Sequence, residues 1–241
     1  MQQERHFLEN EQGVPEISYV HGERDGRPWA HKVEIIGPRP AATVAAKMRG
    51  WYVTVSEDFG AELTARGARL IRHAHVISCD LGAAAAWPPA TAPEGFRFTP
   101  CDRAPEEVLP AWRNAFPPGH PDHSPRTDEE VLREELAPLL RGELIGPLLP
   151  CSSLAVDLTD RVVAGVVVND WDGLSWVANA FRHPAGTPRG LGLTLFRHVI
   201  QKAAADGLES LTAVVSQANP ARHIWPRIGF RTTETSMTVL L

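Results

Sequence analysis

The sequence predicts an α/β (α+β) fold in two parts, a small N-terminal domain and a larger C-terminal one. Three observations favour this class. Three strand-like runs follow one another at 152–158, 161–171 and 174–183. An apolar stripe with helical spacing comes next, over 191–203. An Ala/Pro-rich stretch at 83–95 has the composition of a semi-extended linker between domains.

The N-terminal domain, 1–82, is expected to alternate short strands and helices. Residues 1–30 are polar, contain glycine and show little periodicity, so we expect a loosely ordered entry with one strand at 17–20. The further expected elements are a strand at 31–36, a helix at 40–48, a strand at 51–55, a helix at 57–65 that ends at Gly67, and a β-rich run at 68–79.

The C-terminal domain, 96–241, is expected to open with a strand at 96–99 and a helix at 105–116. Thr127 and Glu130 form a capping box that predicts a helix to about residue 140. After the three strands and the helix at 193–205, the remaining expected elements are a strand at 211–216, a helix at 220–228 capped by Asn219, and a last strand after Phe230.

A glycine-containing turn precedes the helix at 193–205. Gly190 and Gly192 carry no side chain to hold a ligand away from the backbone, and a helix N-terminus presents unpaired N–H groups. This pattern indicates a phosphate site, although a plain tight turn has the same pattern. A dinucleotide fingerprint would need a small residue where Leu195 stands, and a Walker loop would need Gly-Lys-Ser/Thr.

A second motif follows the glycine turn, after the helix at 193–205 and the strand at 211–216. Asn219-Pro220-Ala221 leads into Ile224-Trp225 and ends at Gly229-Phe230. With the glycine turn, this run resembles the GNAT superfamily of acyl-CoA-dependent N-acetyltransferases, whose pattern is Gln/Arg-x-x-Gly-x-Gly/Ala followed by Asn…Ala-x-x-Leu-Tyr-x-x-x-Gly-Phe. The resemblance covers roughly the last 150 residues.

The resemblance implies a mixed, mostly antiparallel, twisted sheet flanked by helices. It also implies acetyl-CoA, or another acyl-CoA, as cosubstrate. A backbone N–H near the end of the strand at 174–183 is expected to face the thioester carbonyl as an oxyanion site. The residues that the resemblance assigns to acyl-CoA are Asn179, Ala180, Phe181, Thr187, Pro188, Arg189, Gly190, Leu191, Gly192, Leu193 and Asn219.

Three positions depart from the family pattern. Thr187 stands at the Gln/Arg position, so one phosphate-facing side chain is lost. Trp225 stands at the position of the tyrosine that protonates the leaving thiolate, and an indole N–H does not titrate usefully. Trp225 is therefore either part of the catalytic site or a packed core aromatic. Pro226 removes a backbone hydrogen bond from the predicted helix.

The resemblance implies that the proline-rich loop at 117–125 covers the acceptor pocket. In it, His120, Asp122 and His123 could bind or deprotonate an amine, and Asp170 is a further candidate base. A solvated surface turn would have the same composition. The implied function is acyl transfer to the amine of a small molecule or a peptide. The alternative is a non-catalytic acyl-CoA sensor or subunit.

The N-terminal domain echoes the second motif. Leu63-x-x-x-Gly67-Ala68 before a strand parallels Trp225-x-x-x-Gly229-Phe230, which predicts a degenerate GNAT-like half unless the match is chance. His73, His75 and Cys79 share one strand face, but no fourth ligand is nearby, so we expect no metal.

Composition narrows the partners. The formal net charge of −5 argues against nucleic acid, and no apolar run is long enough to cross a bilayer. The N-terminus lacks the layout of a secretory signal. Three widely spaced cysteines indicate reduced thiols and a cytoplasmic protein. Whether the chain forms a homodimer is left open.

Overall fold

The structure is a computed structural model that describes residues 4–241. The chain divides into two compact units. The C-terminal unit is Val76–Thr233, and the N-terminal unit runs up to His75 and also includes Glu234–Leu241. Strands β5 (Arg69–Asp80) and β11 (Arg231–Leu240) therefore contribute residues to both units, and the expected linker contains a short 3₁₀ turn, η1 (Ala84–Ala86).

The C-terminal unit is built on a mixed sheet in which the strand order is β5-β10-β9-β8-β7-β6. Antiparallel pairs join β6 to β7, β7 to β8 and β8 to β9, whereas β9 and β10 are parallel. This is the mostly antiparallel sheet that the sequence predicted. The strands are β6 (Phe96–Pro100), β7 (Ser153–Asp157), β8 (Val162–Trp171), β9 (Leu174–Arg182) and β10 (Ser210–Ser216).

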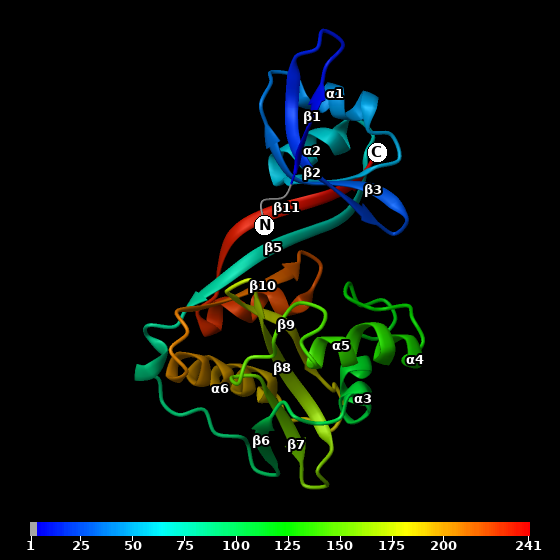
Figure 1. The fold of residues 1–241 in the computed structure, drawn as a ribbon. Helices are drawn as coiled ribbons and strands as arrows, with labels where there is room; N and C mark the ends of the chain where they lie inside the picture. Colours follow the sequence, from blue (N-terminus) through cyan, green and yellow to red (C-terminus); the bar gives the residue numbers. More distant parts are fainter. Residues whose placement is uncertain (1–3) are drawn as a thin grey trace. The chain divides into compact units, whose positions relative to one another are not determined.

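Helices cover both faces of this sheet (Figure 1). On one face, α6 (Leu191–Ala205) buries Leu195 and Val199 against Val166. On the other face, α3 buries Val108 and Trp112 against Val167 and Phe181. The elements on that second face are α3 (Pro105–Ala115), α4 (Asp128–Val131), the π-helical turn η2 (Leu132–Leu136) and α5 (Ala137–Leu140).

The capping box at the start of α4 is confirmed. The hydroxyl of Thr127 accepts a hydrogen bond from the N–H of Glu130 at 3.3 Å, and the Glu130 carboxylate accepts from the N–H of Thr127 at 2.8 Å. These two bonds satisfy donors that a helix start would otherwise leave unpaired. The bonds that the Glu130 carboxylate accepts from the Thr127 N–H and from the Thr127 hydroxyl lower the pKa of Glu130.

The expectation of an α-helix at 220–228 is wrong. Two 3₁₀ turns stand there, η3 (Pro220–His223) and η4 (Trp225–Ile228). Pro226 has no N–H to continue a helical ladder, so the chain tightens into short turns instead. Both predicted ends are present, because Asn219 accepts from the N–H of Ala221 at 2.8 Å and Gly229 stops the run at φ +90°.

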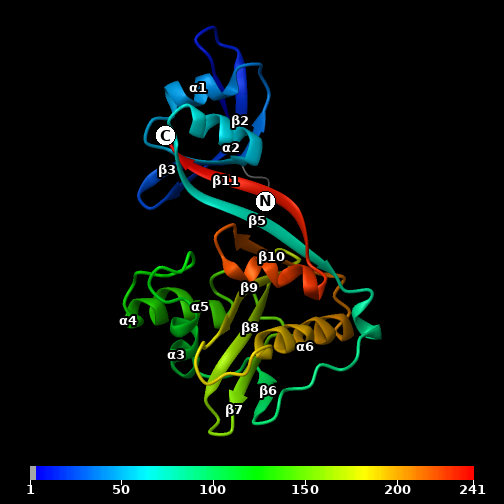
Figure 2. The ribbon, with the colours of Figure 1, turned by 180° about the vertical axis from the view of Figure 1, so that it is seen from behind.

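The N-terminal unit has the strand order β1-β2-β3-β4-β11-β5. Its helices α1 (Pro40–Lys47) and α2 (Glu57–Ala65) lie side by side (Figure 2) and bury Val44, Phe59 and Leu63 in one core with Ile17. The second half of β11 pairs antiparallel with β4, from Ser236↔Ser56 to Leu240↔Tyr52. The remaining strands are β1 (Arg5–Glu9), β2 (Pro15–Arg24), β3 (Arg27–Ile35) and β4 (Tyr52–Ser56).

The expected strand at 17–20 is confirmed within β2, but the loosely ordered entry expected around it is wrong for residues 4–30, and residues 1–3 lie outside the described part. Strands β1, β2 and the start of β3 form an antiparallel sheet there. Asp25 and Gly26, both at positive φ (50° and 70°), turn β2 into β3. Asp-Gly is the typical dipeptide of a tight hairpin turn, so this signal in the sequence could have predicted both strands.

One supersecondary unit occurs in both halves of the chain. In the C-terminal unit, β9-α6-β10 is a parallel crossover in which only Thr212↔Trp176 and Ala213↔Val177 pair. In the N-terminal unit, β3-α1-β4 is the same crossover, paired only at Trp29↔Tyr52 and Ala30↔Val53. The N-terminal unit thus repeats the central part of the C-terminal fold, which agrees with the predicted degenerate half.

The central strand β8 provides a stability test. A Cβ added at Gly165 would come within 2.6 Å of Phe181 Cε1 and 2.8 Å of Leu154 Cδ2. We expect Gly165→Ala to lower the free energy of unfolding by about 1–3 kcal/mol, because both neighbours are buried and must move. Chemical denaturation measures the change. Combining it with Phe181→Leu should cost less than the sum of the two single changes, and strict additivity would contradict the steric account.

Candidate active site

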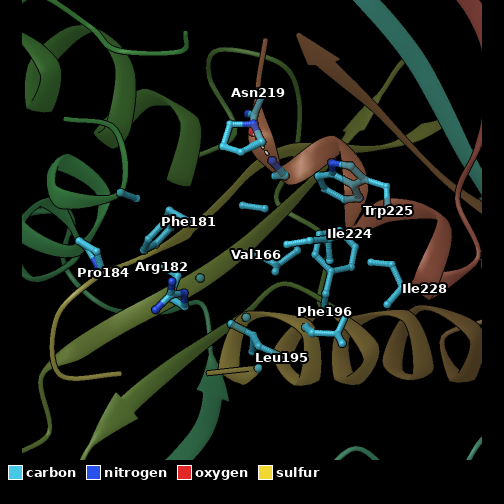
Figure 3. A pocket seen from close by; sticks show the side chains of 18 of the residues that line it. Val166, Phe181, Arg182, Pro184, Leu195, Phe196, Asn219, Ile224, Trp225 and Ile228 are labelled. Carbon is cyan, nitrogen blue, oxygen red and sulfur yellow. Dashed lines mark hydrogen bonds between the residues drawn. The ribbon is translucent and has the colours of Figure 1, made fainter. Parts of the chain in front are cut away.

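A cavity of about 500 Å³ lies within the C-terminal unit. Figure 3 shows its walls, with Phe181 and Arg182 from β9 on one side, Leu195 and Phe196 from α6 on another, and Trp225 facing them. Most of the lining is apolar. The polar lining side chains are His120, Arg182, Arg189 and Asn219.

The cavity opens where two parallel strands part. Pairing of β9 with β10 ends at Val177↔Ala213, whereas β9 stays paired with β8 as far as Arg182. The β8–β9 register also shifts, because Val167 lies opposite Asn179 and Val168 opposite Val177, so Ala178 is an extra residue. A bulge of this kind bends the strand. Beyond it, Ala180 and Phe181 line the cavity.

The glycine turn forms one end of the cavity. Gly190 is the N-cap of α6 at φ +96°, and a Cβ added there would meet nothing within 4 Å. Gly190, Gly192 and Leu193 line the cavity. Within residues 4–241 no acceptor faces the N–H groups of Gly192 and Leu193, the donors that a helix start leaves over. The turn is open to an anion and not filled by side chains.

Two arginines stand beside the turn. Arg182 and Arg189 both line the cavity, and the Arg182 guanidinium donates to the Thr187 hydroxyl at 2.5 Å. That hydroxyl in turn donates to the carbonyl of His183 at 2.7 Å, so Thr187 braces the loop. Sequence analysis missed Arg182. Its place as the last residue of a strand directly before the glycine turn was the available signal.

The predicted cofactor residues divide into two groups. Leu191 is fully buried under the turn, and the Asn179 side-chain oxygen is buried with no partner in the described chain. Neither they nor Thr187 and Pro188 are among the residues that line the cavity. The predicted residues that do line it are Ala180, Phe181, Arg189, Gly190, Gly192, Leu193 and Asn219.

The loop at 117–125 is fastened beside the cavity through Asp122. One carboxylate oxygen of Asp122 accepts from the Ser216 hydroxyl at 3.0 Å, and the other accepts from Asn219 Nδ2 at 2.6 Å. Ser216 ends β10 and Asn219 caps η3. Asp122 therefore ties the loop to the second sequence motif, a role that sequence analysis did not assign to it.

The two histidines of this loop have opposite proton arrangements. His120 Nδ1 accepts from the N–H of Asp122 at 3.1 Å, so the neutral ring carries its proton on Nε2. His123 Nδ1 lies 2.8 Å from the carbonyl oxygen of Phe116, which only accepts, so the neutral ring keeps a lone pair on Nε2. His120 lines the cavity, whereas His123 does not, although Phe116, to which His123 is hydrogen-bonded, does. Of the two neutral rings, that of His123 presents an acceptor at Nε2 and that of His120 presents a donor.

The other predicted catalytic residues lie as follows. Asp170 sits at the β8–β9 turn, where it accepts from the N–H of Gly173 at 2.6 Å, and it does not line the cavity. Trp225 lines the cavity and packs edge-on between Phe196 and Phe230, with ring centroids 4.9 and 5.1 Å away. Its indole N–H is buried without a partner in the described chain. Trp225 is therefore a packed aromatic and a cavity wall at once.

The His, Cys, Asp and Glu side chains bear on two other kinds of chemistry, metal binding and thiol chemistry. Among residues 4–241, no group of three or more His, Cys, Asp or Glu side chains is placed to hold a metal ion. His73 Nε2 lies 3.2 Å from Glu57 Oε1, and His75 Nδ1 is hydrogen-bonded to the Thr235 hydroxyl at 2.9 Å. Burial raises the pKa of Cys101 to about 12 and that of Cys151 to about 11, so both thiols stay protonated near neutral pH. Within the same residues, no helix combines the length and apolar character needed to cross a bilayer.

Helices on both faces of a mixed sheet, a parting parallel strand pair and a glycine turn at the crossover helix define the GNAT class of fold. Comparison with known proteins agrees. Residues 157–239 match the family model described as FR47-like protein. No curated protein matches the chain.

Three solved structures illustrate the similarity. A GCN5-related N-acetyltransferase from Sphaerobacter thermophilus has 16% identity, a TM-score of 0.63, and coverage of 98% of this chain and 80% of that one. A tandem GNAT protein from the clavulanic acid biosynthesis pathway has 14% identity, a TM-score of 0.61 and coverage of 95% and 80%. A GCN5-related N-acetyltransferase from Kribbella flavida has 16% identity, a TM-score of 0.56 and coverage of 93% and 86%. The chain has a GNAT fold in a tandem arrangement.

The Asp122 bonds give a direct test of how the loop is held. We expect Asp122→Ala to speed hydrogen exchange of the amides at 117–125 by about tenfold or more, because two bonds to an ionised carboxylate are lost. Asp122→Asn, which keeps one acceptor, should fall between. Exchange at α6 should not change. Equal exchange at 117–125 in all three proteins would contradict the anchoring role.

Proposed function

We propose that this protein is an N-acyltransferase that moves an acetyl, or other short acyl, group from acyl-CoA to an amine of a small molecule or peptide. The observation that carries the proposal is the open glycine turn at one end of an apolar cavity, next to the parting of β9 and β10. Such a site suits a ligand with a diphosphate at one end and an uncharged arm. Acyl-CoA has both.

Acyl-CoA binding would use the backbone more than side chains. The N–H groups of Gly192 and Leu193, with the partial positive charge of the α6 start, would hold the diphosphate. Arg182 and Arg189 supply positive charge beside it, which offsets the missing Gln/Arg at Thr187. The uncharged arm would lie along Phe181, Phe196 and Trp225 and place the thioester near the bulge at Ala178.

The acyl-transfer step needs stabilisation of a developing oxyanion. Past Val177, β9 has no strand partner on the side of β10. A backbone N–H between residues 178 and 182 would donate to the thioester carbonyl as negative charge builds on it. Because the strand is fixed by β8 on its other side, this donor needs little reorganisation during the reaction.

The amine must lose a proton as it attacks. His123 is the better base of the two loop histidines, because its Nε2 has the free lone pair. Because His123 does not line the cavity, a water molecule would carry the proton from the amine to its Nε2. His120 would act as a donor through Nε2–H, since protonating its Nδ1 would break the bond from the Asp122 N–H.

The departing thiolate is treated differently from the family pattern. Trp225 has no titratable proton, so it could donate a hydrogen bond to the sulfur but not protonate it. Ser216 already donates its hydroxyl to Asp122, and neither it nor the exposed His223 lines the cavity. We propose that the thiolate leaves unprotonated and is neutralised by solvent, which a thiol of ordinary pKa permits.

A non-catalytic acyl-CoA sensor or subunit is the second candidate. The Trp225 substitution favours it, because a sensor needs the cradle but no general acid. Release of free thiol from acetyl-CoA with a panel of amines would support the enzyme, whereas thermal stabilisation by CoA without turnover would support the sensor. A cytoplasmic location and a homodimer remain proposals to be tested by fractionation and by light scattering.

The cradle is tested by charge. We expect Gly192→Asp to weaken acetyl-CoA binding at least about a hundredfold, or roughly 2.7 kcal/mol, because a carboxylate would then face the diphosphate. Isothermal calorimetry measures this. Gly192→Ala should bind more nearly like wild type, because a Cβ there comes no closer than 3.6 Å to Arg182 Cδ. Gly173→Asp, which adds the same charge in the β8–β9 hairpin turn, is the control for charge. Unchanged acetyl-CoA affinity in Gly192→Asp would refute the cradle.

The base is tested by a pair of variants at His123. Loss of a general base should lower turnover by about 10²–10⁴-fold in both His123→Ala and His123→Asn, with acetyl-CoA affinity retained. Thiol release with the best amine of the panel measures turnover. Asn can still donate to the Phe116 carbonyl, so it keeps the loop bond without the base. Full activity in His123→Asn would show that the ring only positions the loop.

A further inference from the structure

Glu16 on β2 is a buried carboxylate that the proposed chemistry does not use. It is 0% exposed, and no other Asp or Glu among residues 4–241 is buried. Its Oε2 accepts from the N–H of Arg39 at 2.7 Å, and its Oε1 accepts from Asn10 Nδ2 at 2.9 Å. A buried carboxylate is costly unless it is well bonded, so these donors are what hold it there.

The carboxylate lies at the start of the crossover helix of the N-terminal unit. Arg39 is the N-cap of α1 and its side chain makes no capping bond, and Pro40 at the first helical position has no N–H. The N–H of the N-cap is therefore bonded to Glu16, whereas the N–H groups of Ala41 and Ala42, which correspond to those of Gly192 and Leu193, are not. In the C-terminal unit, the corresponding start of α6 is the open turn at Gly190.

The turn before α1 is also closed by its own packing. It has four residues (36–39), whereas the turn before α6 has eight (183–190). The N–H groups of Ile36 and Gly37 both donate to the Glu16 carbonyl, at 2.9 and 3.0 Å. Even a Cβ at Gly37 would lie 2.6 Å from the Pro15 carbonyl and 2.8 Å from Glu16 Cδ. The space beside Gly37 is therefore filled by Pro15 and Glu16 of β2.

We infer that the Glu16 carboxylate, bonded to the N-cap of α1, and the short turn before that helix keep a diphosphate from the start of α1, so that each chain binds one acyl-CoA and binds it in the C-terminal unit. This inference rests on the proposed function for the site at α6. The N-terminal unit is then a structural half, and the negative charge beside the start of its helix α1 belongs to Glu16 of the same chain.

Binding stoichiometry is the first test. Calorimetry of the full chain with acetyl-CoA should give one site, and Gly192→Asp should remove it. A second equivalent of acetyl-CoA bound by the wild type would overturn the inference. So would binding heat that persists in Gly192→Asp, if acetyl-CoA then protects amides of the N-terminal unit from hydrogen exchange. No heat from the wild type would instead overturn the proposed function, and the role of Glu16 would then be decided by its stability test.

Stability tests Glu16 independently of any ligand. Glu16→Gln keeps the shape but presents an NH₂ to either the Arg39 N–H or the Asn10 amide, so two donors would face each other. We expect its melting temperature to fall by about 5 °C or more. Glu23→Gln, on the exposed part of the same strand, should leave it unchanged. An unchanged melting temperature in Glu16→Gln would overturn the assignment.

Discussion

The parting of β9 and β10 is the constraint on which the rest of the C-terminal unit depends. Two parallel strands held at only two residue pairs leave a wedge between them, and the extra residue Ala178 bends β9 at the same level. Backbone groups along such a wedge need partners, and a ligand can supply them where no strand does. The α6 helix begins from the far end of β9, so its first N–H groups reach the same cavity. The cavity, the proposed oxyanion donor and the proposed anion cradle all follow from one interrupted pairing.

A single carboxylate, that of Asp122, joins the loop at 117–125 to β10 and η3. Asp122 accepts from Ser216 at the end of β10 and from Asn219 at the start of η3. Asn219 also caps η3 through its other side-chain atom, so the amide of one residue serves two purposes. His120 and His123 flank Asp122, and their tautomers are set by bonds to the backbone of Asp122 and Phe116. The position of the loop is thus tied to β10 and to the second motif through Asp122, whereas the proton arrangement of its histidines is set locally.

Local signals in the sequence predicted the elements well and their partners poorly. The strands β7, β8 and β9, the capping box at Thr127 and the cap at Asn219 were predicted because each is encoded within a few neighbouring residues. Pro226 was noticed, yet its effect was underestimated, since one missing N–H turned a helix into two 3₁₀ turns. Asp25-Gly26 was overlooked, so β2 was expected only at 17–20 and β1 was not expected at all. The bonds of Asp122 reach 94 and 97 residues along the chain, and the place of β11 beside β4 is equally non-local, so no periodicity could reveal them.

The two crossovers show how one backbone arrangement can serve different ends. A helix start carries unpaired donors and partial positive charge, which some acceptor must meet. In the N-terminal unit the chain supplies that acceptor itself, because a short turn brings β2 and its Glu16 under Arg39. In the C-terminal unit the longer turn, with glycine at 190 and 192, keeps side chains away and leaves the donors to solvent. The first solution gives a helix whose N-cap donor is satisfied by the chain itself, and in our proposal the second gains stability when an anion binds. In that proposal, turn length and one carboxylate separate a structural half from a binding half.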